Sequence, residues 1–201
     1  MARSDAERRH REFAPMSDFE IGVYWRWADR FPQPIDSFFK LLLITGYRPG
    51  EVSDADWNDL DLENGYWLLR SRKYHRVVHI SPWAISILPH THPHSSGRIF
   101  SPFPTEDDRM VMRARKLISS WQKKSTFERR LALPDIRWNV MFRLRSLGVD
   151  NGLVDIALGR TSISSKLQSI YLPGAIEQHT LLVWENDLRR ILAEPGGGDQ
   201  L

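Results

Sequence analysis

The segment from Leu41 to Glu51 limits what this chain can fold into more than any other. Leu41-Leu42-Leu43-Ile44 continues an apolar helical pattern that begins after Pro34, which predicts a buried helix. Gly46 is expected to end that helix, because glycine readily adopts the left-handed conformation at a helix C-terminus. Pro49 fits the first position of a short helix. The end of a packed helix therefore presents Arg48, with Glu51 three residues later.

Composition and length indicate one soluble domain. The chain has 201 residues, of which 41% are hydrophobic and 26% charged, enough for a core of its own. The absence of cysteine excludes disulfides and thiolate metal sites. No apolar run approaches the roughly 20 residues needed to cross a membrane, and the first residues lack a signal-peptide pattern. We expect a cytoplasmic protein with no membrane partner, a flexible arm at 1–15, a domain at 16–193 and a flexible tail at 194–201.

The pattern of the chain predicts a mainly α fold with a small antiparallel β-sheet. Tyr66–Leu69 and Val77–Ile80 are predicted strands, following the Asn64-Gly65 turn and separated by a basic turn. Ile99-Phe100 is a further candidate strand, within a loop at 89–104. Helices are predicted at 17–31, 34–45, 49–51, 82–88, 105–124, 137–147, 151–158, 163–171 and 175–193.

Positive charge is concentrated in one part of the chain. The net charge is +3, and residues 109–130 contain eight basic residues against the single acidic Glu128. Such a segment suits a surface that faces phosphates, although a solvated helix face would look the same. The candidate DNA-binding residues are Arg113, Arg115, Lys116, Lys123 and Lys124.

Thr45-Gly46-Tyr47-Arg48-Pro49-Gly50-Glu51, followed by Asp56-Trp57-Asn58-Asp59 and a hairpin, resembles the first catalytic box of the tyrosine recombinase (phage integrase) family. The resemblance implies the integrase catalytic-domain fold and double-stranded DNA as partner. It implies that Arg48 holds the scissile phosphate and that Glu51 supports this arginine. The family places a lysine in the hairpin turn, for which Lys73 is the candidate and Arg72 the alternative.

Two later boxes depart from the family pattern, so the active site is degenerate by sequence. Arg137 matches the second arginine, but Pro134 stands where the family has histidine, and proline cannot transfer a proton. Arg160 replaces the histidine or tryptophan after Leu158-Gly159. Tyr171 is the candidate nucleophile, although it lies farther after Arg160 than is usual in the family.

Two functions follow from the resemblance. In the first, the protein acts in site-specific DNA recombination or integration for a mobile genetic element. Arg48 and Arg137, with Arg160, would neutralise the phosphate, Lys73 would act as acid, and Tyr171 would form a 3′-phosphotyrosyl link without a metal or nucleotide cofactor. In the second, the same fold is a catalytically inactive DNA-binding or partner-binding accessory module. A protein-interaction domain built on the aromatic-rich N-terminal half is a third, plainer alternative.

The resemblance also concerns the two ends of the chain. It implies assembly with a second copy or a partner recombinase through the C-terminal helix at 175–193, and association with the nucleoid when DNA is bound. The helical core-binding domain that precedes the catalytic domain in most of the family is expected to be absent. The alternating His90, His92 and His94 are not expected to form a metal site.

Overall fold

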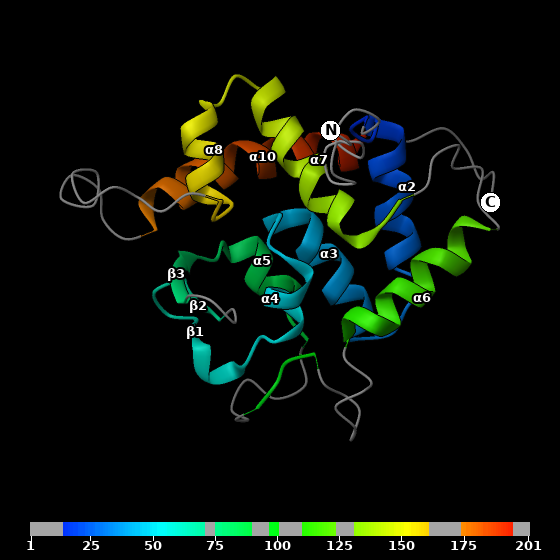
Figure 1. Ribbon diagram of the computed structural model, residues 1–201, viewed down its shortest axis with the longest axis horizontal. Coiled ribbons are helices and arrows are strands. Elements are labelled where there is room, and N and C mark those ends of the chain that lie inside the picture. Colours follow the sequence, from blue (N-terminus) through cyan, green and yellow to red (C-terminus); the bar gives the residue numbers. More distant parts are fainter. Residues whose placement is uncertain are drawn as a thin grey trace, which may run out of the picture.

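The computed structural model describes residues 14–70, 75–89, 97–100, 110–123, 131–160 and 174–194. In these ranges the protein is mainly helical with one small antiparallel sheet, as predicted, and the sheet has three strands (Figure 1). The helices are α2 (Asp18–Ala28), α3 (Ile35–Thr45), α4 (Pro49–Ser53), α5 (Pro82–Ile87), α6 (Met110–Gln122), α7 (Leu133–Ser146), α8 (Asn151–Ala157) and α10 (Ala175–Ala193), with a 3-10 turn at Trp57–Asp59. The strands are β1 (Leu60–Asp61), β2 (Tyr66–Arg70) and β3 (His75–His79).

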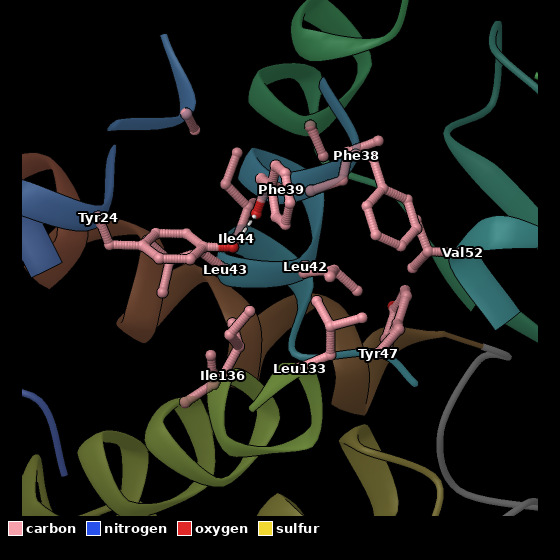
Figure 2. Packing of buried hydrophobic residues seen from close by; sticks show 14 of the residues in the cluster. Tyr24, Phe38, Phe39, Leu42, Leu43, Ile44, Tyr47, Val52, Leu133 and Ile136 are labelled. Atoms are coloured by element: carbon pink, nitrogen blue, oxygen red, sulfur yellow. Dashed lines mark hydrogen bonds between the residues drawn. The ribbon is translucent and has the colours of Figure 1, made fainter. Parts of the chain in front are cut away.

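Helix α3 forms the centre of the core. It contacts α2, α5, α6, α7 and α10, and both faces of its leucine-rich half are buried. Figure 2 shows Phe38 and Leu42 on the side of Tyr47 and Val52, with Ile136 of α7 packed below. Burial of such apolar side chains is the main stabilising contribution to folding.

The turn after α3 places Arg48 at the candidate site. Gly46 caps the helix with a φ of 63°, the left-handed conformation predicted from the sequence. A Cβ atom at Gly46 would lie 2.9 Å from Cγ1 of Val140, so α7 also packs closely against this turn. Pro49 is the first residue of α4, as expected, and leaves Arg48 at the helix N-cap.

The sheet packs its inner face against the helices. Strand β2 lies between β1 and β3, with Trp67 opposite Leu60 on one side and Val78 on the other. Trp67 and Val78 are buried, and the Tyr47 hydroxyl donates a hydrogen bond to the His79 carbonyl at 3.2 Å. This contact ties the end of β3 to the segment that carries Arg48.

Three details differ from the prediction. Helix α7 begins at Leu133 rather than 137, because proline is well accepted in a first helical turn and Asp135 accepts a hydrogen bond from the N-cap Ala132. The predicted strand Ile99-Phe100 is wrong: the bridge there joins Arg98 to Asp56, and the two apolar residues are buried in a turn. Helix α2 ends at Ala28, before Phe31. Several predictions fall outside the described residues. They are residues 1–13 of the predicted arm at 1–15, residues 195–201 of the predicted tail at 194–201, the helix predicted at 163–171 and the three alternating histidines.

The C-terminal helix α10 packs within its own chain. It contacts α2, α3, α7, α8 and β3, and Trp184 donates from Nε1 to the Leu43 carbonyl at 2.8 Å. Arg143 of α7 pairs with Asp18 of α2 and with Asp187 of α10, which links the first and last described helices. None of the helices in the described ranges combines the length and the apolar character needed to cross a membrane.

Candidate functional site

Three arginines from distant parts of the chain meet at the C-terminal end of α8. Arg76 Nη1 donates to the Ala157 carbonyl at 3.2 Å, Arg137 Nη2 donates to the Leu158 carbonyl, and Arg48 Nη2 donates to the Gly159 carbonyl at 2.9 Å. The last carbonyls of a helix lack partners within the helix, and cationic side chains commonly satisfy them. Consecutive carbonyls at one helix end therefore gather guanidinium groups from β3, α7 and the start of α4.

Arg48 is held firmly but stays accessible. Its Nη1 donates to Glu51 Oε1 at 2.8 Å, and its backbone N–H donates to Glu51 Oε2 at 3.0 Å. The Glu51 carboxylate is buried, whereas 39% of the Arg48 side chain is exposed. A charge-assisted pair of this kind fixes the guanidinium, and the side chain stays partly exposed to solvent.

Arg137 lies in the second turn of α7 and bridges two helix ends. Its Nη1 donates to the carbonyl of Gly46, the C-cap of α3, at 3.0 Å, while Nη2 reaches the end of α8. The pKa of Arg137 is lowered to about 10, mainly by burial and further by the positive charge of Arg48, against the opposing effect of Glu51. Arg137 is thus still charged at neutral pH, and burial is the main reason that its pKa is lowered.

Arg76 belongs to the cluster, although the sequence reasoning missed it. Its guanidinium lies 5.0 Å from the centre of the Tyr47 ring, and its Nη2 is 3.8 Å from Glu51 Oε2. Strand alternation could have indicated that Arg76 faces inward, because it lies on the same side of β3 as the buried Val78. Val77 and Val78 are both apolar, so the sequence does not show which of them faces inward. The basic turn before them also suggested that Arg76 was one more solvated residue.

Arg160 lies beside the cluster with its guanidinium directed elsewhere. Its guanidinium carbon is 4.7 Å from the centre of the Trp138 ring, Nη1 contacts Met141 Sδ at 2.9 Å, and Nε is 3.4 Å from Asp155 Oδ1. Its charge still contributes to lowering the pKa of Arg137. Pro134 is exposed in the first turn of α7, where its ring offers no group for proton transfer.

The remaining predicted residues divide into two groups. Lys73, its alternative Arg72, Tyr171 and Lys124 fall outside the described ranges, so their roles remain predictions. The other basic residues of the candidate DNA-binding segment are exposed on or just after α6, whose residues Met110 to Gln122 include no acidic side chain. These exposed residues are Arg113, Arg115, Lys116 and Lys123.

Comparison of the whole structure with known proteins identifies its class of fold. No protein-family description matches the chain, and no curated protein matches it. The structure does match a solved structure of a recombinase, so the protein has a tyrosine-recombinase-like fold. That structure is the crystal structure of XerA recombinase, with a TM-score of 0.55 and 18% sequence identity over 85% of this chain and 63% of that one. The chain therefore spans less than two thirds of the recombinase, and at this identity the likeness concerns the fold.

Proposed function

We propose that this protein binds double-stranded DNA by gripping a backbone phosphate with Arg48 and Arg137, as a recombinase-like module in DNA recombination. The observation that carries the proposal is the convergence of guanidinium groups on the end of α8, beside the Glu51 carboxylate that pairs with Arg48 and lies 3.8 Å from Arg76. Planar guanidinium groups suit phosphate oxygens, because two N–H donors can meet them at once.

The charge balance of the site supports an anionic ligand. Repulsion from neighbouring arginines lowers the pKa of Arg137 in addition to the effect of burial, so a bound phosphate would relieve part of this repulsion. Arg48, with 39% of its side chain exposed, is accessible to a phosphate that approaches from solvent. The outward basic face of α6 would add contacts to further phosphates, which increases affinity without selecting a sequence.

Duplex binding at several salt concentrations tests the proposal. Arg48→Ala is expected to weaken binding by about 10- to 100-fold at low salt, the effect of one charge-assisted hydrogen bond. The slope of log K against log salt, which is negative, should also become less steep by about 0.9. Arg26→Ala removes an exposed arginine from α2, away from the cluster, and serves as the matched control. Equal affinity of Arg48→Ala and Arg26→Ala would contradict the proposal.

Strand cleavage is a separate activity that the same fold could support. It would need Tyr171 as nucleophile and Lys73 as acid, and it would proceed without help from Pro134. Nicked suicide duplexes drawn from repeats flanking the gene would trap a covalent adduct that survives SDS. An adduct that disappears in Tyr171→Phe would establish cleavage, whereas salt-sensitive binding without an adduct would favour the inactive accessory module.

A further inference from the structure

Gly159 and Arg76 fit each other closely. Gly159 has a φ of +63°, and a Cβ atom there would lie 2.6 Å from both Cζ and Nε of Arg76. Real Cβ atoms essentially never approach other heavy atoms so closely, so the guanidinium occupies the volume that any other residue at 159 would need. The glycine after α8 therefore has a packing role in addition to its conformational one.

Arg76 also contacts both groups that hold Arg48. Its Nη2 lies 3.8 Å from Glu51, which accepts two hydrogen bonds from Arg48. Its Nη1 binds the Ala157 carbonyl, two residues before the Gly159 carbonyl that binds Arg48 Nη2. A shift of Arg76 would consequently move both supports of Arg48 together.

The environment of Arg76 is costly for an arginine. Only 15% of its side chain is exposed, and its buried Nε and Nη2 have no hydrogen-bond partner among the described residues. Unpaired buried donors destabilise a fold, whereas the face of the Tyr47 ring and the Glu51 charge compensate in part. A residue kept only for stability would be better replaced by an apolar side chain of similar size.

We propose that Arg76 is a positioning residue for Arg48: by filling the space beside Gly159, it fixes Glu51 and the end of α8, the two supports that orient Arg48. The consequence for DNA binding rests on the proposed phosphate site. Arg76 itself does not contact the phosphate, because its outer nitrogen atoms are directed at Glu51 and the end of α8 rather than at solvent.

A double-mutant cycle tests the pair through DNA affinity. Arg76→Leu and Gly159→Ala are each expected to weaken duplex binding by about 10- to 100-fold, because each removes the orientation of Arg48. The double variant should bind no more weakly than Arg76→Leu alone, because the shorter leucine leaves room for the new methyl group. Gly148→Ala is the matched control, since Gly148 has a φ of +83° with no atom within 4 Å of the added Cβ. Fully additive losses, or an equal loss in the control, would overturn the proposal.

A second measurement decides the positioning role without DNA. In 15N–1H spectra, the Nε–H signal of Arg48, assigned through Arg48→Lys, should shift or broaden in Arg76→Leu. The signal of Arg190, which is held by Asp18 and Asp187 in another part of the molecule, should stay in place. Should Arg76→Leu fail to fold by thermal melting, Arg76→Gln serves in both experiments. An unchanged Arg48 signal would overturn the positioning role, whereas unchanged DNA affinity in Arg48→Ala would instead refute the phosphate site.

Discussion

Replacing Glu51 with glutamine removes the charge that the clustered arginines share and keeps the shape of the side chain. Glu51 is 5% exposed, accepts two hydrogen bonds from Arg48 and lies 3.8 Å from Arg76. Removing one partner of a buried ion pair typically costs about 3–5 kcal/mol. Arg48 is partly solvated and a glutamine oxygen can still accept a hydrogen bond, so we expect a loss near the lower end, about 3 kcal/mol.

Thermal and urea unfolding would measure this loss. For a domain of this size, about 3 kcal/mol corresponds to a decrease of about 6–12 °C in Tm. Glu63→Gln makes the same chemical change at an exposed position in the turn before β2 and should stay within about 0.5 kcal/mol of the wild type. An anion that binds only the folded state stabilises it. Inorganic phosphate should therefore stabilise Glu51→Gln more than Glu63→Gln, because only Glu51→Gln removes the negative charge beside the clustered arginines. A loss below about 0.5 kcal/mol in Glu51→Gln would refute the idea that the arginines depend on this carboxylate.

Three further predictions concern single residues. Gly46→Ala should destabilise by at least about 1 kcal/mol more than Gly148→Ala in urea unfolding, because only the first places its methyl group against Val140; equal losses would contradict this. DNA affinity should fall as pH rises through about 10, where Arg137 loses its charge, and Arg137→Gln should lack that component of a pH titration. Burial raises the pKa of Glu177, so its charged form destabilises the fold at neutral pH. Glu177→Gln should therefore stabilise by about 1 kcal/mol at pH 7, and the gain should disappear in unfolding experiments below about pH 4, where the unfolded chain is protonated as well.

The sequence predicted those parts of the fold that depend on local signals. The left-handed Gly46 and the proline at the start of α4 are decided within a few residues, and both are present. The resemblance to the first recombinase box implied that Glu51 supports Arg48, and the two residues do pair within one turn. The overall class, mainly helical with a small sheet, followed from the same periodicities.

What the sequence left out depends on contacts between distant segments. Arg76 joins the cluster because β3 lies beside the end of α8, and nothing near residue 76 in the chain encodes that neighbour. Arg160 was predicted to join the phosphate contacts, but Trp138 and Met141, which come from α7, provide an alternative place for its guanidinium. The fit of Gly159 to Arg76 could not be inferred either, because glycine after a helix has a sufficient local explanation as a C-cap.

The end of α8 makes the candidate site sensitive to the packing of the whole domain. Arg48 depends on α4 and the turn after α3, Arg137 on the contact between α7 and Gly46, and Arg76 on the position of β3. Each guanidinium is attached to a different element, so a displacement of α8 would disturb their common arrangement. Core variants that loosen α8 should therefore weaken DNA binding without changing the charge of the protein, whereas loss of a surface cation on α6 should weaken binding and reduce the salt dependence together. This difference separates a preorganised phosphate site from a merely basic surface, because only the former loses affinity when its geometry, and not its charge, is changed.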